Sequence, residues 1–347
     1  MKKSLNIAGM NIPQDVEFII SSTRIRLARN LDAYPFPNYL EEEKAKEVLT
    51  LLRHEIKALD SFTEYEIDKI TPMHAAYMQE KHLISPALIK RGAKGAAFIS
   101  EDERISIMVN EEDHLREQYI VKDFNLMGAY EKIVGVDDLI GSKVNFAYDQ
   151  QLGYLTACPS NLGTGMRASV MMFLPGLTES GELKKLLPSL KKGGLTVRGV
   201  FGEGSQAEGY TYQVSNERTL GLSENAILEL MTEIAYNLCT LELHEREKML
   251  EKNGLEVKDS CLRAYGTLTN CALLSQEEMS NLLTKLRLGV VLGFFRVRSM
   301  EQFDSFISEM QPASFRMKYN PNTEEEAQSI RASVSSTEIK KCITRLY

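Results

Sequence analysis

The sequence is short of the features that mark membrane, secreted and metal-binding proteins. The apolar run from Leu288 to Phe295 is too short to cross a bilayer, and the N-terminus lacks the apolar stretch of a signal peptide. The five cysteines are widely spaced, without the CxxC pairs of a structural zinc site. An odd number of separate thiols is typical of a reducing compartment. We therefore expect a soluble, cytoplasmic protein with no metal site of its own and no membrane contact.

An excess of positive charge is also missing. The 41 basic and 48 acidic residues leave a formal net charge of −7, which argues against binding to nucleic acid. The standard nucleotide signatures are absent: there is no GxxxxGK[ST] loop and no HRD or DFG motif, and GEGSQAEG (202–209) does not match GxGxxG. Local basic clusters remain able to bind phosphate.

The first part of the chain contains several sequence patterns typical of short strands. Alternating or β-rich stretches occupy 103–110, 195–201 and 210–214, and a hairpin pattern joins 143–148 to 154–157. Strands connected by hairpins and short loops favour an antiparallel sheet over a doubly wound parallel one. The length of 347 residues favours two domains.

Helical patterns surround these strands and dominate the C-terminal part. Residues 41–59 have apolar side chains at helical spacing, and Ser223 caps a long helical pattern that we expect to stop at Asn253-Gly254. Residues 255–347 are mostly helical in pattern, with a possible strand around Leu288 to Val297. The prediction is an α+β fold: a mainly antiparallel sheet flanked by helices in 1–253, then a helical domain in 254–347.

The least ordinary segment is CPSNLGTGMRASV (158–170), which joins a thiol to a loop with two glycines. Cys158 as a nucleophile would need a histidine and an orienting acid or amide, and nothing local supplies them. A lone cysteine after a strand is more often a packing residue. The backbone N–H groups of NLGTG are suited to binding an anion.

Five arginines stand beside predicted strand ends and glycine turns. Arg24 and Arg26 lie two apart, so on a strand both side chains project from one face. Arg116 follows NEEDH, Arg167 follows the glycine loop, and Arg198 lies in VRGVFGEGS. Each alone is typical of a surface residue or an ion-pair partner. Together they indicate convergence on a polyanion, because the planar guanidinium binds two phosphate oxygens at once.

Two acidic positions complete the pattern, Glu111-Glu112 at one strand end and Glu203 in GEGS. They would either pair with the arginines or hold a cationic acceptor beside the phosphates. The residues alone leave both readings open.

Four segments in order, SSTRIRLARN, NEEDHLR, CPSNLGTGMRASV and VRGVFGEGSQAEG, resemble the ATP:guanidino phosphotransferases of the phosphagen-kinase superfamily. Within it, EKHLISPAL (80–88), GYLTACPSN, VSNERTLG and RAYGTLTNC resemble the bacterial protein-arginine kinases (McsB type). The resemblance covers nearly the whole chain. Metabolic phosphagen kinases place a helical domain before the STRxR segment, and its absence here is similar to the protein-arginine kinases.

This resemblance implies a phosphagen kinase or glutamine-synthetase-like catalytic domain that uses ATP and Mg²⁺. It assigns the ATP phosphates to Arg24, Arg26, Arg116, Arg167 and Arg198. It places His82 near the nucleotide base. Glu112 and Glu203 would grip the acceptor guanidinium, with Glu112 as the catalytic base, and Cys158 would tune that guanidinium rather than attack phosphorus.

The implied activity is phosphorylation of arginine side chains in proteins, for quality control and the stress response. The implied partners are protein substrates with exposed arginines, a zinc-binding activator protein, a Clp ATPase or protease, and a second copy that forms a homodimer through the C-terminal domain. A kinase of free arginine or another small guanidine, and a non-catalytic phosphoarginine reader, are the alternatives. The family's RDxxRA motif corresponds to AQSIRA (327–332), where Ala327-Gln328 replaces Arg-Asp and puts self-stimulation by phosphoarginine in question.

Overall fold

An eight-stranded antiparallel sheet is the centre of the fold, as the sequence predicts. The computed structural model describes residues 16–59, 62–199 and 208–346. The sheet order is β2-β3-β4-β5-β1-β8-β10-β9, and each neighbouring pair is antiparallel. In that order the strands are Phe62–Glu66, Ala96–Ser100, Ile105–Val109, Leu115–Val121, Ile20–Arg29, Met166–Phe173, Thr211–Asn216 and Leu195–Gly199.

Helices surround the sheet and build the C-terminal region. They are α1 Val16–Ile19, α2 Glu42–Lys57, α3 Pro72–Glu80, α4 Pro86–Ile89, α5 Leu126–Gly141, α6 Pro175–Glu179, α7 Glu182–Lys192, α8 Glu224–Asn270, α9 Gln276–Val291, α10 Met300–Glu309, α11 Pro312–Tyr319 and α12 Glu324–Cys342. Single 3-10 turns occupy Pro37–Tyr39, Gly92–Lys94, Pro159–Asn161 and Glu208–Tyr210. No helix in the described part of the chain has both the length and the apolar character needed to cross a membrane.

The two faces of the central strands differ because their side chains alternate. Ile25 and Leu27 of β1 and Val170 of β8 point to one face, where they are fully buried against Ile133 of α5 and Met231 of α8. At the β2–β4 end, α3 and α4 pack on the opposite face. The face of β5, β1, β8, β10 and β9 that points away from α5 and α8 is the one that carries the arginines.

Most of the predicted elements are confirmed, with three corrections. The helix in 41–59 is α2, and the strands around 103–110, 195–201 and 210–214 are β4, β9 and β10, although residues 200 and 201 lie outside the described residues. The predicted hairpin is much shorter, pairing only β6 Tyr148–Asp149 with β7 Gly153–Tyr154. Its first strand is lost because the backbone of Asn145 and Ala147 bonds to residues 30–32 instead.

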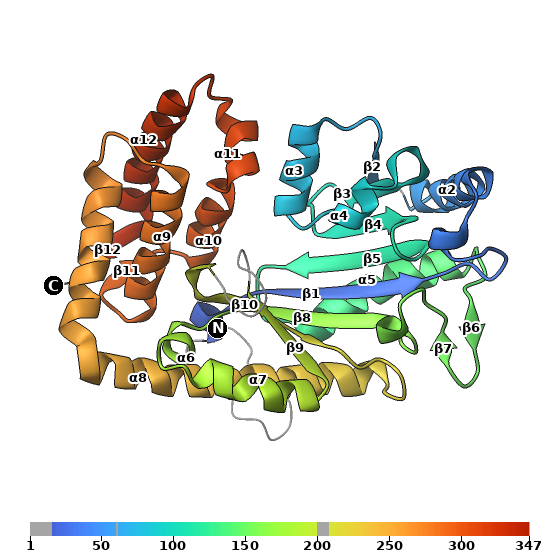
Figure 1. Ribbon diagram of the computed structural model, residues 1–347, viewed down its shortest axis with the longest axis horizontal. Helices are drawn as coiled ribbons and strands as arrows, with labels where there is room; N and C mark the ends of the chain where they lie inside the picture. Colours follow the sequence, from blue (N-terminus) through green and yellow to red (C-terminus); the bar gives the residue numbers. More distant parts are fainter. Residues whose placement is uncertain (1–15, 60–61, 200–207, 347) are drawn as a thin grey trace.

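The second correction concerns the helix that begins after Ser223, whose side chain caps it as predicted. The helix does not stop at Asn253. It has one non-helical residue there (φ −134°, ψ 24°) and continues to Asn270, and Gly254 does not take the positive φ of a helix-ending glycine. Figure 1 shows α8 running beneath the sheet and then turning into the C-terminal helices.

The third correction concerns the strand expected around Leu288 to Val297. Leu288 lies in α9, and the strand is only β11 Phe295–Val297, which pairs with β12 Ile343–Arg345 near the chain end. These elements and α8 to α12 surround a second hydrophobic core. That core includes Phe173 of β8, so the C-terminal helices pack directly on the end of a central strand.

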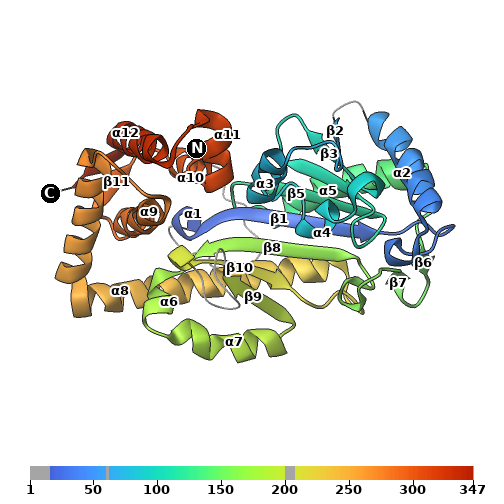
Figure 2. The same ribbon diagram turned by 45° about the horizontal axis from the view of Figure 1, so that its top comes forward.

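A single carboxylate also fastens the C-terminal helices to the sheet side. Glu80, the last residue of α3, accepts hydrogen bonds from the backbone N–H groups of Ala313 (2.6 Å) and Ser314 (2.8 Å) in the first turn of α11. The N-cap residue Gln311 makes no side-chain cap of its own. Glu80 therefore caps a helix that lies beside α3 in two views (Figure 1 and Figure 2), and its charge complements the positive end of the helix dipole.

We predict that Glu80→Ala weakens this contact by about 1–2 kcal/mol, the usual cost of losing a charged helix cap. In the full chain, amide hydrogen exchange in the first turn of α11 should accelerate by about tenfold. Glu338→Ala is a matched control, because the one ion pair that Glu338 makes with a described residue is exposed, with Lys341. Equal exchange in the two variants would contradict a capping role for Glu80.

Candidate active site

One face of the sheet carries all five arginines singled out in the sequence. Arg24 and Arg26 lie two apart on β1, and the antiparallel register sets Arg26 directly opposite Arg167 of β8. Arg116 of β5 pairs with Ala28, two residues beyond Arg26, and is therefore on the same face. Arg198 of β9 reaches this face through its pairing with Gln213 of β10. The register of five adjacent strands thus gathers five guanidinium groups.

These positive charges have few negative partners among the described residues. Arg116 forms an ion pair with Glu111 (2.7 Å), whereas Arg26, Arg167 and Arg198 make no ion pair or hydrogen bond in the described parts of the chain. The Nε atoms of Arg26 and Arg167 are buried without a partner. Loss of hydration, and then the charges of Arg116 and Arg167, lower the pKa of Arg24 to about 10. The face is therefore built to receive an anion.

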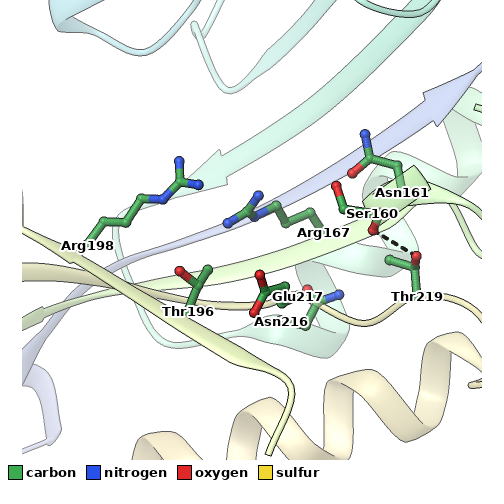
Figure 3. A pocket seen from close by; sticks show the side chains of 8 residues that line it. All are labelled: Ser160, Asn161, Arg167, Thr196, Arg198, Asn216, Glu217 and Thr219. Carbon is green, nitrogen blue, oxygen red and sulfur yellow. Dashed lines mark hydrogen bonds between the residues drawn. The ribbon is translucent and has the colours of Figure 1, made fainter. Parts of the chain in front are cut away.

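A pocket of about 80 Å³ opens at this face, between β8, β9 and the segments that flank them. Figure 3 shows the side chains of Arg167 and Arg198 extending over the same space above the strands. The hydroxyl of Thr219 donates to the carbonyl oxygen of Ser160 (2.9 Å) and holds the 3-10 turn after Cys158 against the other wall. The remaining lining side chains are polar: Asn161, Thr196, Asn216 and Glu217.

Asp113 joins the loop that carries Glu112 to the loop that carries Cys158. Its buried Oδ1 accepts hydrogen bonds from the Asn30 side chain (2.6 Å) and from the backbone N–H of Ala157 (2.7 Å). The Asp113–Ala157 hydrogen bond therefore joins the residue after Glu112 to the residue before Cys158. The Cys158 Sγ lies 3.0 Å from the Ser160 Oγ, and Cys158 is close enough to Arg167 to influence its pKa.

The neighbouring acids Glu111 and Glu112 have different surroundings. Glu111 is buried and accepts from the hydroxyl of Ser85, from Arg116 and from the backbone N–H of Glu112. Burial alone would raise the pKa of Glu111, but Arg116 and these hydrogen bonds hold it below its usual value, so the group is ionised. Glu112 is exposed, and its carboxylate has no partner among the described residues. Glu111 holds the turn in place and leaves Glu112 free to bind a cation.

His82 is close enough to Arg24 and Arg26 for their charges to act on its imidazole. Its backbone adopts a positive φ of 58°, and the side chain of Gln118 donates to its carbonyl oxygen. Much of its surface is exposed. Loss of hydration, and then the charges of Arg24 and Arg26, nevertheless lower the pKa of His82 to about 4. The imidazole is therefore neutral at pH 7.

Arg29 holds the glycine loop that precedes Arg167. It forms a buried ion pair with Asp137 of α5 (2.8 Å), donates to the Thr164 carbonyl oxygen (3.1 Å), and its guanidinium lies 3.6 Å from the ring centre of Tyr154. Gly165 has φ 64°, and a Cβ there would lie 2.5 Å from the Arg29 Nη1. Only glycine fits at this position.

The structure thus brings together eight of the nine residues singled out in the sequence: Arg24, Arg26, His82, Glu112, Arg116, Cys158, Arg167 and Arg198. Glu203 lies outside the described residues. No cluster of three or more His, Cys, Asp or Glu side chains that could hold a metal occurs in the described parts of the chain. Sequence reasoning missed Asp113 and Arg29, which position the loops. Both lie inside quoted motifs, Arg29 in SSTRIRLARN and Asp113 in NEEDHLR, and that position is the signal that could have found them.

Comparisons with known proteins identify the family. Residues 43–245 match the model of the ATP:guanido phosphotransferase C-terminal catalytic domain, and residues 254–345 match that of the protein-arginine kinase McsB C-terminal domain. The chain is 40% identical over 329 residues to a protein-arginine kinase of Caldanaerobacter subterraneus, with 93% of this chain and 97% of the relative covered. The chain belongs to the protein-arginine kinase family. A protein-arginine kinase of Clostridium tetani is 38% identical, with 94% and 96% covered.

Solved structures of other kinases have a similar fold. A lombricine kinase matches with a TM-score of 0.59 and 26% identity, over 68% of each chain. The duplicated taurocyamine kinase of Schistosoma mansoni matches with the same TM-score of 0.59 and the same 26% identity. The match covers 71% of this chain and 36% of the longer kinase chain. The predicted fold class and the predicted family are therefore confirmed.

The buried acid Glu117 makes the stability of the protein depend on pH. Glu117 of β5 is fully buried beside Asp137, on the sheet face opposite to the arginines. Burial, and then the charge of Asp137, raise the pKa of Glu117 well above its ordinary value. A carboxyl with a raised pKa in the fold contributes its full stability below the unfolded pKa of about 4.3 and loses it as the pH rises.

Glu117→Gln removes this titration, so the variant should gain stability over the natural protein as the pH rises from 5 to 9. The gain should grow by at most about 1.4 kcal/mol per pH unit, measured by chemical denaturation. Glu64→Gln is the control, because partial burial of Glu64 is outweighed by Lys57 and Arg53, which lower its pKa. The stability that Glu64 contributes is lost only as the pH falls below the ordinary carboxyl range, so the difference for this variant should stay constant from pH 5 to 9. A stability difference for Glu117→Gln that does not change with pH would show that Glu117 does not titrate as described.

Proposed function

We propose that this protein transfers the γ-phosphoryl group of ATP to the guanidinium group of arginine side chains in proteins. The observation that carries the proposal is the arrangement of five arginines, four of them without a negative partner among the described residues, beside the free carboxylate of Glu112. The names of the related proteins point to the same activity.

Arg24, Arg26, Arg116, Arg167 and Arg198 bind the phosphate groups in this proposal. Charge-assisted hydrogen bonds from guanidinium groups to phosphate oxygens are strong, and they also neutralise the charge that spreads over the transferring group. The neutral imidazole of His82 faces the same side of the sheet and is suited to contact the nucleotide base without adding charge.

Glu112 and Glu203 hold the acceptor, and Glu112 takes its proton. A guanidinium is a poor nucleophile because its pKa exceeds about 12, so a base must remove a proton as the phosphoryl group arrives. The free, exposed carboxylate of Glu112 supports this role. Two carboxylates would hold the plane of the guanidinium in line with the γ-phosphate. Cys158 lies beside this position and adjusts the acceptor's charge without forming a bond to phosphorus.

Mg²⁺ enters this scheme together with the nucleotide. Mg²⁺ keeps several waters and is commonly bound through substrate phosphates and one or two carboxylates, so a complete protein cage is not needed. It would neutralise charge on the phosphates. Glu112 is assigned to the acceptor, and Glu111 is engaged by Ser85 and Arg116, so Mg²⁺ would be held mainly by the nucleotide phosphates and water.

A direct assay separates this function from its two alternatives. The protein is incubated with MgATP and either casein or free L-arginine, and acid-labile phosphate is located by mass spectrometry. Label on protein arginines alone supports the proposal. Label on free arginine alone would identify a small-guanidine kinase, and no label on either would identify a phosphoarginine reader.

Glu112→Gln tests the proposed base. We expect kcat to fall on the order of a hundredfold or more, because the amide cannot accept the proton, while MgATP binding measured by calorimetry survives. Glu101→Gln, an exposed acid in the turn between β3 and β4, is the matched control and should keep full activity. A Glu112→Gln protein with normal turnover, or one that no longer binds MgATP, would refute the assigned role.

Narrower proposals follow from the family resemblance. We propose that residues 1–253 form the catalytic domain and that 254–347 form a domain through which two copies associate. We also propose that the enzyme works in the cytoplasm, where a zinc-binding activator and a Clp ATPase act with it in the stress response. The separate matches to 43–245 and 254–345 support the division. Sedimentation of the full chain tests the dimer, and a monomer at all concentrations would contradict it.

A further inference from the structure

A line of neutral side chains crosses the arginine face and ends on Arg24. The Arg24 Nη2 donates to the Gln213 Oε1 (2.6 Å), the Gln213 Nε2 donates to the Ser215 Oγ (2.8 Å), and the Ser215 hydroxyl donates to the Ser169 Oγ (3.0 Å). Ser215 and Ser169 are buried and directly opposite each other on β10 and β8. The chain of hydrogen bonds therefore rests on the rigid centre of the sheet.

The direction of this chain is determined by its chemistry. A guanidinium has only donors, so the amide of Gln213 must turn its oxygen toward Arg24. Its NH₂ group then donates to the hydroxyl of Ser215, two residues further along the same strand. With both ends of the amide engaged, Gln213 has a single favourable orientation, and so has the guanidinium bonded to it.

A neutral partner is the useful choice at this position. A carboxylate would hold Arg24 more strongly, but it would cancel part of the positive charge and compete with phosphate oxygens for the same N–H groups. The amide oxygen restrains Arg24 and leaves its charge intact. Loss of hydration and the charges of Arg116 and Arg167 already lower the pKa of Arg24, so an unrestrained side chain would turn away from its neighbours toward water.

We propose that Gln213 is a positioning residue that aims Arg24 at the phosphates of the nucleotide, with Ser215 and Ser169 as its anchor. The inference rests on the proposed function and goes beyond it, since it concerns a residue that touches Arg24 and not the reacting groups. Pre-orienting a long side chain removes the entropy cost of ordering it when the ligand binds. Gln213 should therefore act on nucleotide affinity more than on the chemical step.

The test uses the full chain and measures MgATP binding by calorimetry, together with KM and kcat on casein. Gln213→Leu should weaken MgATP binding by about threefold to tenfold, the effect of ordering one long side chain, and should raise the KM for ATP more than it lowers kcat. Thr211→Val changes a side chain on the same face of the same strand and should bind MgATP as the natural protein does.

Gln213→Glu separates positioning from simple packing. This nearly isosteric change should raise the melting temperature without nucleotide, because a carboxylate pairs with Arg24, and yet weaken MgATP binding more than Gln213→Leu does. In an Arg24→Ala background, Gln213→Leu should cause no further loss of affinity, because the residue acts through Arg24.

Two results would overturn the inference. One is normal MgATP binding by both Gln213 variants, and the other is an undiminished effect of Gln213→Leu when Arg24 is already alanine. A natural protein that neither binds MgATP nor labels casein would instead refute the proposed function. The two failures are therefore distinguishable.

Discussion

The mutual repulsion of five arginines on one face of a sheet is the constraint on which the site depends. Bringing guanidinium groups together costs free energy, and the described carboxylates offset little of it, since only Glu111 forms an ion pair with one of the five. The pKa of Arg26 is lowered well below its ordinary value by loss of hydration and by three arginine neighbours. An anionic ligand relieves this repulsion, so the electrostatic free energy that destabilises the unbound protein increases its affinity for phosphate.

The surrounding structure holds this unfavourable arrangement in place. The opposite face of the same strands is fully buried against α5 and α8, which anchors the strand register that aligns the arginines. Behind the glycine loop, the buried ion pair of Arg29 and Asp137 connects the loop to α5. On the other side, Asp113 ties the Glu112 turn to the backbone just before Cys158. Each of these contacts positions a loop without touching the proposed ligands.

The sequence predicted the side chains of the site better than it predicted their supports. The two-residue spacing of Arg24 and Arg26 was enough to place both on one face, because strand side chains alternate. The motifs then identified Arg116, Arg167 and Arg198 and indicated that they converge, but only the register of β5, β8 and β9 shows which residues lie opposite each other. The difference between Glu111 and Glu112 was not predictable, since it depends on Ser85, 26 residues away. Gln213 was not predictable either, because polar residues alternate on any half-exposed strand. The Asn-Gly signal at 253–254 was overridden because the continuing helix buries Cys261 and Leu268 in the second core.

The dependence of nucleotide binding on the number of phosphate groups tests the central claim most directly. The melting temperature of the protein is measured with ATP, ADP, AMP and adenosine at equal concentrations and constant Mg²⁺, since a ligand stabilises the fold in proportion to the logarithm of its binding. If the arginine face binds phosphate, the stabilisation should be largest for ATP, should decrease with each phosphate removed, and should be absent for adenosine. An equal increase in melting temperature with adenosine and with ATP would contradict the account.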